Sequence, residues 1–327
     1  MRKGVKLLLK VCLSVVLLGL LALEMDLKKF VAVVASADIS LILLATAVQI
    51  MITLIAVYRW RVILENFQIR TPLWPLTRIM FIGQFFNLFL PSAIGGDVFR
   101  GYYLSRREHR GMSTTLTTTV LERSAGLLAL LAIGCIAAAA HPMVVKGFNL
   151  LYLFVGLLIA FVLANVALFN PWMHKWITRV LCRLRLPNIE SKLELVYEGL
   201  GTLRKNPKAI VSCLLISFVI QFVAVVIMWL AALAIEVRAP FSVFLVFIPV
   251  VNLTLMIPLT PNSLGIREGV YFLLFAEIGV AAETSVTLSL LNFLIVALSS
   301  LPGAVFYSLH KKEEDFVDIL GKPETTL

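Results

Sequence analysis

Long runs of hydrophobic residues alternate with short basic segments along most of the chain. Six runs are long enough to cross a membrane as single helices: residues 5–23, 39–58, 113–140, 150–170, 209–235 and 284–309. A helical crossing needs about 20 apolar residues, because the hydrocarbon core is ~30 Å thick and a helix rises about 1.5 Å per residue. A membrane β-barrel would instead show alternating strands of about ten residues. The pattern therefore predicts an all-α polytopic membrane protein.

Two further apolar regions, 76–98 and 241–282, are interrupted by the same short motif. The first copy is Pro91-Ser92-Ala93-Ile94-Gly95, followed by Gly96, and the second is Pro261-Asn262-Ser263-Leu264-Gly265. Proline removes a backbone donor and glycine relaxes the chain, so each motif is expected to break a helix. The predicted breaks are Pro91, Gly95, Gly96, Pro261 and Gly265.

Composition and charge then set the class and the orientation. Hydrophobic residues make up 60% of the 327 positions, against about 45–50% in a soluble domain. The net charge is +10, and most of the excess lies in loops that the positive-inside rule assigns to the cytoplasm. The charge therefore indicates topology and not nucleic-acid binding. We expect an inner-membrane protein with cytoplasmic N- and C-termini.

Loop charge also predicts how the interrupted regions enter the membrane. Region 76–98 has arginines on both sides: Arg59, Arg61, Arg70 and Arg78 before the bend, and Arg100, Arg106, Arg107 and Arg110 after it. Both flanks are then cytoplasmic, which predicts a re-entrant hairpin that bends near Pro91–Gly96. Region 241–282 is predicted to enter from the other side. If the interrupted regions are crossings instead, the chain has about eight spans.

The order helix, helix, hairpin, helix occurs twice, which predicts an inverted repeat within one membrane domain, residues 1–327. The half-repeats are 5–140 and 150–310, and an odd number of crossings in each makes the second inverted. Residues 171–208 are predicted to form a basic, amphipathic cytoplasmic loop, either a contact for anionic lipid or a topogenic signal. Residues 311–327 are expected to be a cytoplasmic tail.

Six charged residues lie beside the breaks or inside a predicted span. They are the acids Asp97, Glu122 and Glu268 and the bases Arg100, Arg123 and Arg267. An unpaired charge in hydrocarbon is costly, so we expect them to neutralise one another. One interpretation is an ion-pair network that locks both hairpins to helix 113–140. The other is a polar cavity where the guanidinium forks bind phosphate, with Asn87, Ser92, Asn262 and Ser263 as polar lining.

The sequence shows no catalytic constellation. It contains no H-E-x-x-H, no G-x-S-x-G and no phosphate-binding glycine loop, and its cysteines and histidines lack metal-ligand spacing. We therefore expect no catalytic residue, no metal and no cofactor. Two alternatives stay open: a membrane lipid or polyprenyl transferase with Asp97 or Glu122 as acid or base, and a non-catalytic scaffold for a lipid-modifying enzyme.

Several motifs together resemble the membrane region of lysylphosphatidylglycerol synthases. They are Arg59-Trp60-Arg61, the first break with Asp97 and Arg100, Glu122-Arg123, and the second break with Arg267-Glu268-Gly269. The resemblance covers about residues 6–310. It implies a flippase-like domain that moves a phospholipid between leaflets, in a stand-alone member without the aminoacyl-transferase domain. Some single-domain relatives in that family accompany isoprenoid, hopanoid or polyprenyl-sugar lipid metabolism.

Residues and resemblance together predict a protein that binds and translocates an anionic phospholipid or a polyprenyl-type lipid. Arg100, Arg123 and Arg267 are expected to contact the headgroup. Asp97, Glu122 and Glu268 are expected to hold these arginines and to couple transport to protons. The expected partners are membrane lipids and a separate lipid-modifying enzyme.

Overall fold

The computed structural model describes residues 26–89, 95–108, 111–169, 179, 201, 206–256, 260 and 263–310. The helices within these ranges are α2 (Leu27–Ala35), α3 (Ile39–Asn66), α4 (Leu73–Phe89), α5 (Gly95–Glu108), α6 (Met112–Ala140), α7 (Leu150–Phe169), α10 (Pro207–Ala234), α11 (Phe241–Leu255), α12 (Ile266–Ala276) and α13 (Ala282–His310). A short turn between α6 and α7 pairs β1 (Val144–Val145) antiparallel with β2 (Phe148–Asn149). The predicted first helix, most of loop 171–208 and the tail lie outside the described residues.

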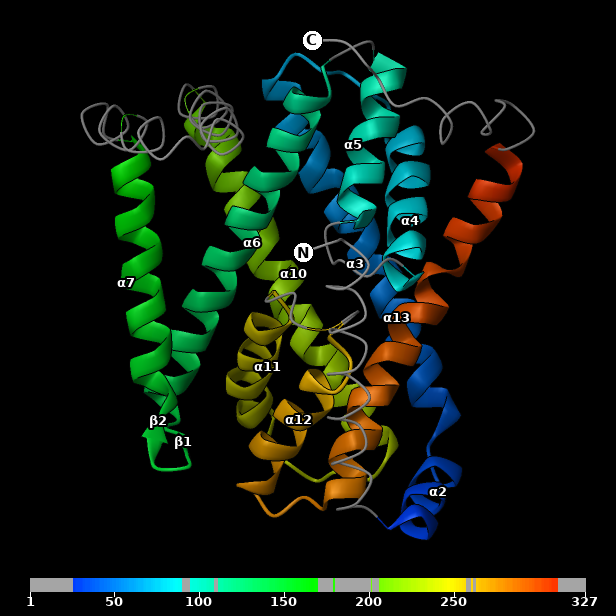
Figure 1. Cartoon of the computed structure of the whole chain (residues 1–327), viewed down its shortest axis with the longest axis vertical. Coiled ribbons are helices and arrows are strands. Elements are labelled where there is room, and N and C mark those ends of the chain that lie inside the picture. Colours follow the sequence, from blue (N-terminus) through cyan, green and yellow to red (C-terminus); the bar gives the residue numbers. More distant parts are fainter. Residues whose placement is uncertain are drawn as a thin grey trace.

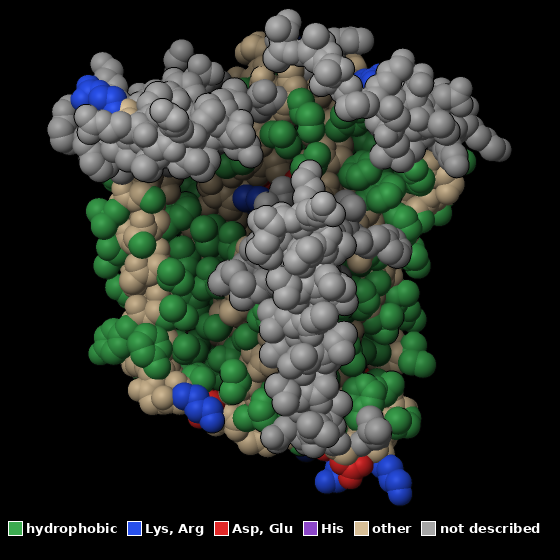
Figure 2. Space-filling view, in the orientation of Figure 1, with side chains coloured by type: hydrophobic (Ala, Val, Ile, Leu, Met, Phe, Trp, Pro, Cys, Tyr) green, Lys and Arg blue, Asp and Glu red, His purple; other side chains and the backbone are tan. Residues whose placement is uncertain are grey.

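The helices confirm the prediction of a polytopic all-α membrane protein. Among the described residues, α3, α6, α10 and α13 are long and apolar enough to cross a membrane, and α7 and α11 contain shorter apolar helices. Figure 2 shows hydrophobic side chains over the flanks of the molecule, with charged side chains at its lower end. A helix that is apolar on all sides suits this setting, because one face meets protein and the other meets lipid.

Two long antiparallel helices, α3 and α10, form the centre of the bundle. Each has 28 residues, and they pack together along their length. Their ends are tied on both sides: the Asp38 N–H donates to the Ala234 carbonyl at 2.8 Å, and the Asn206 amide donates to Asn66 Oδ1 at 3.0 Å. Asp38 and Asn206 also cap the helix starts by accepting backbone N–H groups. Local sequence therefore sets where these spans begin.

Four of the shorter helices form two hairpins at opposite ends of the bundle. Figure 1 shows α4 and α5 side by side in the upper half and α11 and α12 in the lower half. The helix ends that flank each predicted break, Phe89 and Gly95 in one hairpin and Leu255 and Ile266 in the other, point toward mid-height. The break residues Pro91, Ser92, Pro261 and Asn262 themselves lie outside the described residues.

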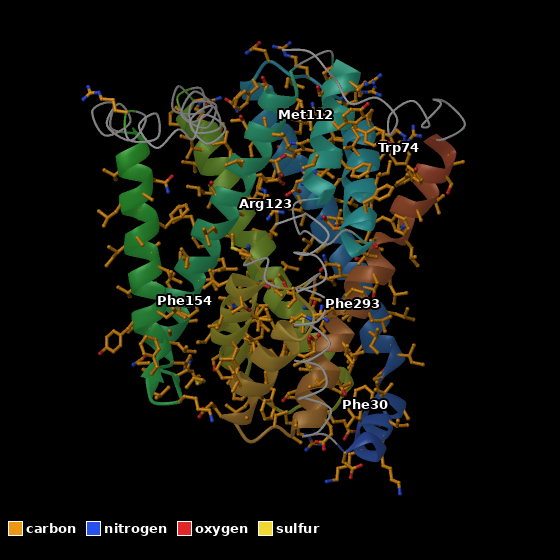
Figure 3. The ribbon with its side chains drawn as sticks, viewed as in Figure 1. Phe30, Trp74, Met112, Arg123, Phe154 and Phe293 are labelled. Carbon is orange, nitrogen blue, oxygen red and sulfur yellow. The ribbon has the colours of Figure 1, made fainter. Side chains whose placement is uncertain are left out.

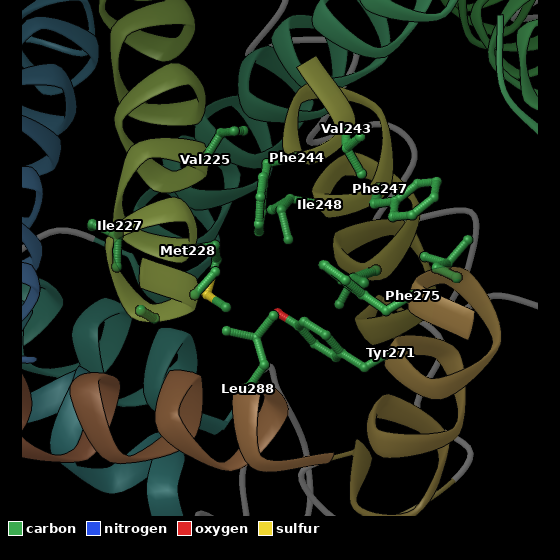
Figure 4. Packing of buried hydrophobic residues seen from close by; sticks show 14 of the residues in the cluster. Val225, Ile227, Met228, Val243, Phe244, Phe247, Ile248, Tyr271, Phe275 and Leu288 are labelled. Carbon is green, nitrogen blue, oxygen red and sulfur yellow. The ribbon is translucent and has the colours of Figure 1, made fainter. Parts of the chain in front are cut away.

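Each half of the bundle has its own apolar core. The lower core joins α10, α11, α12 and α13 around stacked aromatic rings, and Figure 4 shows Tyr271, Phe275, Phe247 and Met228 converging there. The Tyr271 and Phe275 ring centroids are 5.8 Å apart. The upper core joins α3, α4 and α5 around Trp60, which is fully buried.

Close packing of α4 against α5 requires glycine at one crossing. A Cβ atom on Gly96 would collide with the backbone oxygen of Gly83 and with the Asn87 side chain. The Gly96 N–H donates to Asn87 Oδ1 at 2.7 Å, so the same contact closes the hairpin. Gly96 therefore allows the backbones of α4 and α5 to approach closely, and Asn87 accepts a hydrogen bond from the start of α5.

We predict that Gly96→Ala lowers the thermal unfolding temperature of the detergent-solubilised protein. Displacing one helix backbone from another costs about 1–3 kcal/mol. Gly156→Ala on α7 is the matched control, because a Cβ there would meet open space. That control should stabilise the helix by about 1 kcal/mol, the usual gain of Ala over Gly. Equal unfolding temperatures for the two variants would contradict the assigned α4–α5 contact.

Candidate functional site

The first predicted break is followed by a helix that places Asp97 and Arg100 on one face, as their spacing predicts. Arg100 Nη1 lies 3.4 Å from Asp97 Oδ1, one turn into α5. Both side chains are only 9% exposed. A charged pair at this depth requires further partners, and these come from other helices.

Glu122 on α6 is the carboxylate on which several helices converge. Its Oε1 accepts from Arg59 Nη2 on α3 at 2.9 Å, and its Oε2 accepts from Arg100 Nη2 on α5 at 2.8 Å. Arg59 Nη1 also donates to Ser217 Oγ on α10 at 2.9 Å. One buried carboxylate therefore links α3, α5 and α6, and through Arg59 it reaches α10.

Arg123, the next residue on α6, has a different partner. Its Nε donates to Asp97 Oδ2 at 2.6 Å, and its side chain is 43% exposed. Adjacent residues point to different sides of a helix, so Glu122 and Arg123 meet different partners. Figure 3 labels Arg123 on the inner side of α6, and Figure 2 shows a blue side chain set back from the surface at that position.

We call Arg59, Arg100, Arg123, Asp97 and Glu122 the first charged cluster. Among the described residues, three guanidinium groups face two carboxylates in this cluster. The Nε atoms of Arg59 and Arg100 are buried, with no hydrogen-bond partner among the described residues. The Arg100 guanidinium also lies 4.3 Å from the centre of the Trp60 ring. The cluster is therefore suited to receive an anion.

The second break leads to a separate group, Arg267, Glu268 and Ser289, which we call the second charged cluster. Glu268 Oε1 accepts from Arg267 Nη2 at 2.6 Å and from Ser289 Oγ at 3.0 Å, and Glu268 Oε2 accepts from the Gly265 N–H at 2.6 Å. The Arg267 guanidinium also lies 5.4 Å from the centre of the Phe293 ring. This cluster is neutral and ties α12 to α13.

The backbone at the second break is in an uncommon conformation. Gly265 has φ of 86° and Ser263 has φ of 54°, both in the left-handed region that favours glycine. Ser263 is buried at 7% exposure. The predicted break at Gly265 thus coincides with a sharp change of chain direction before α12 begins.

The predicted site residues therefore fall into two groups by their contacts. Arg100, Arg123, Asp97 and Glu122 belong to the first cluster, and Arg267 and Glu268 belong to the second. Asn87, near the end of α4, accepts from the Gly96 N–H at the start of α5, and Ser263 lies shortly before α12, while Ser92 and Asn262 lie outside the described residues. Among the described residues no group of three or more His, Cys, Asp or Glu could hold a metal.

Sequence reasoning missed Arg59. The hydrophobic run suggested a span that ends at residue 58, with Arg59 in a cytoplasmic flank beyond it. That boundary is wrong: α3 continues to Asn66, and Arg59 is buried at 8% exposure inside the bundle. Its charge is compensated by Glu122, which lies 63 positions away in the sequence. The available signal was the motif Arg59-Trp60-Arg61, whose middle residue is also fully buried.

We predict that Glu122→Gln destabilises the protein by about 3–5 kcal/mol, because it leaves two buried guanidinium groups without their counter-charge. Glu65→Gln is the matched control. Glu65 pairs with Arg61 at 2.9 Å on the surface, and its side chain is 48% exposed. Loss of such a pair along a helix costs about 0.5 kcal/mol or less. Thermal unfolding in detergent measures both variants, and equal losses would disprove the central position assigned to Glu122.

Comparison with known proteins places this arrangement in a family. Residues 7–303 match the family described as the lysylphosphatidylglycerol synthase TM region. A UPF0104 membrane protein of Methanocaldococcus jannaschii is 24% identical over 307 residues, which cover 88% of this chain and 90% of that protein. No solved structure matches the chain. The match extends over both hairpins and both charged clusters, and the chain thus belongs to the lysylphosphatidylglycerol synthase TM-region family.

Proposed function

We propose that this protein binds an anionic membrane lipid at the first charged cluster and moves its headgroup across the membrane. The observation that carries the proposal is the convergence of three guanidinium groups on a mostly buried site: among its five described side chains, four are at most 10% exposed. A phosphodiester carries one negative charge and would accept hydrogen bonds from more than one of these guanidinium groups. Arginine suits this role because its planar fork binds two phosphate oxygens at once.

In this proposal the lipid headgroup reaches the first charged cluster at Arg123. It is the most exposed member of the cluster, at 43%, and its partner Asp97 lies in the first turn of α5. A helix N-terminus favours negative charge, so a phosphate beside Arg123 can bind near the first turn of α5 while Asp97 keeps its place. Asp97 and Glu122 would hold the arginines in position.

The proposal includes six crossings, two re-entrant hairpins and an inverted repeat of 5–140 and 150–310, with both termini cytoplasmic in the inner membrane. Two observations support the repeat. Helix lengths match, with 28 residues in α3 and α10 and 29 in α6 and α13. Packing also matches under exchange of the halves: α4 contacts α13 as α11 contacts α6, and α5 contacts α6 as α12 contacts α13.

An inverted repeat would give the two charged clusters opposite access. In Figure 1 the α4–α5 hairpin occupies one end of the bundle and the α11–α12 hairpin the other. Alternating access in such folds proceeds by movement of one half against the other around a site near the midplane. Arg267 would then receive the headgroup from the far leaflet once its bonds to Glu268 and Ser289 open.

We predict that Arg123→Gln weakens binding of phosphatidylglycerol by about 10- to 100-fold, the value of one charge-assisted hydrogen bond. Titration of the lipid into detergent-solubilised protein, followed by native mass spectrometry, measures the change. Arg61→Gln removes a surface arginine of similar exposure, 39%, and should leave binding unchanged. Transfer of fluorescent phosphatidylglycerol between leaflets of proteoliposomes should fall with binding. An unchanged affinity for Arg123→Gln would refute the proposed headgroup site.

The inverted repeat predicts that the hairpin ends lie on opposite sides of the membrane. Arg106, near the end of α5, and Glu277, just after α12, are both exposed. Single cysteines at these positions, with Cys12, Cys135, Cys182 and Cys213 replaced by serine, should react with an impermeant maleimide from opposite sides. Labelling of Arg106→Cys from the outside would make region 76–98 a crossing, and the repeat would fail.

A further inference from the structure

An apolar groove lies beside the first charged cluster, between α6, α7 and α10. Its volume is about 330 Å³, at the lower end of the ~300–1,000 Å³ typical of ligand sites. The residues that shape its walls include Leu121 and Leu128 of α6, Phe161 and Val166 of α7, and Ile210 and Cys213 of α10. In Figure 1, α6 and α7 diverge from the β1–β2 turn, and the upper end of α10 lies between them.

The groove offers almost nothing to a polar ligand. Two of its lining side chains are Ser124 and Asn165, and both are engaged within their own helices. The Ser124 hydroxyl donates to the Val120 carbonyl at 2.9 Å, and the Asn165 amide donates to the Phe161 carbonyl at 2.8 Å. A buried polar ligand group would lose its hydrogen bonds here, so hydrocarbon is the occupant that the walls favour.

The groove wall on α10 lies close to the charged cluster. On α6, Leu121 lines the groove, and Glu122, the next residue, points to another side of the helix. On α10, Cys213 lines the groove, and its carbonyl accepts the Ser217 hydroxyl at 2.8 Å. The Ser217 hydroxyl in turn accepts from Arg59 at 2.9 Å. One helical turn of about 5 Å therefore separates the apolar wall from the guanidinium groups, a distance that one amphipathic molecule spans.

The bilayer is the source of the occupant. On α7, Leu163 is 62% exposed and Val166 is 58% exposed, so this helix presents an apolar surface where lipid surrounds the protein. A groove between such helices is filled from the hydrocarbon side. We propose that it holds a hydrocarbon chain of the same anionic lipid whose headgroup contacts the first charged cluster, an inference that rests on the proposed function above.

The groove would fix the position of the lipid chain, and the hydrophobic effect would contribute little to binding there. Lipid tails are as apolar as leucine, so moving a chain from the bilayer into the groove gains only van der Waals packing. A chain held in the groove would keep its headgroup near Arg59, which donates to Ser217 one turn from the groove wall on α10. The measurable quantity is therefore where the chain lies, and a photoreactive lipid reports it directly.

The test uses the full chain in phosphatidylcholine nanodiscs with phosphatidylglycerol that carries a diazirine midway along one acyl chain. Phosphatidylcholine with the identical chain is the headgroup control. Mass spectrometry locates the crosslinked peptides. Phosphatidylglycerol should label the groove segments of α6 and α10 more than phosphatidylcholine does. Ala125→Phe fills the groove and should lower that labelling about threefold or more, because a chain has no space beside the ring.

Matched variants separate groove filling from a general loss of folding. Ala164→Phe makes the same change on the exposed side of α7 and should leave labelling unchanged. Leu214→Phe fills the groove from the opposite wall and should repeat the effect of Ala125→Phe. If both groove variants keep wild-type labelling while Arg123→Gln removes the preference for phosphatidylglycerol, the groove inference fails and the proposed function stands. Equal labelling by the two lipids also overturns the inference, since the groove then holds bulk lipid only.

A different outcome would refute the proposed headgroup site alone. If Arg123→Gln leaves the preference for phosphatidylglycerol intact while Ala125→Phe and Leu214→Phe still lower labelling, the groove holds a lipid chain and the headgroup site at the first cluster is refuted.

Discussion

The bundle depends on one buried carboxylate with two guanidinium partners. Glu122 accepts from Arg59 at 2.9 Å and from Arg100 at 2.8 Å, and these residues come from α6, α3 and α5. In the membrane interior such contacts have no water to replace them, so each charge is tolerated only while the others are present. The short hairpin α4–α5 is held beside the long helices by these bonds and by the close crossing at Gly96.

Both charged clusters pair buried charges, but they differ in how many acids and bases take part. In the second cluster, one arginine and one carboxylate neutralise each other, and Glu268 also accepts from the Gly265 N–H. In the first cluster, the carboxylates of Asp97 and Glu122 are shared among three arginines. The first arrangement therefore gathers three guanidinium groups at one place, while the second pairs one arginine with one carboxylate at the start of α12. The structural role of the first cluster is compatible with the binding site proposed there.

The apolar groove would hold the hydrocarbon part of the proposed amphipathic ligand. Its wall on α6 begins at Leu121, directly before Glu122, and its wall on α10 includes Cys213, one turn before Ser217. On α10, the apolar wall and the serine that binds Arg59 thus lie on neighbouring turns of one helix. Membership of the lysylphosphatidylglycerol synthase TM-region family agrees with a lipid environment for both.

The sequence by itself determined that the chain is a helical membrane protein, that its helices break before Gly95 and Gly265, and that charged residues follow those breaks. Hydropathy and backbone chemistry are local, so a single segment reveals them. Which charged residues pair with one another is not determined by the local sequence. Only the tertiary structure shows that Arg59 pairs with Glu122, Arg123 with Asp97 and Arg267 with Glu268. A helix continues past the end of its hydrophobic run when a distant helix supplies the opposite charge, and that compensation exists only once the bundle has formed.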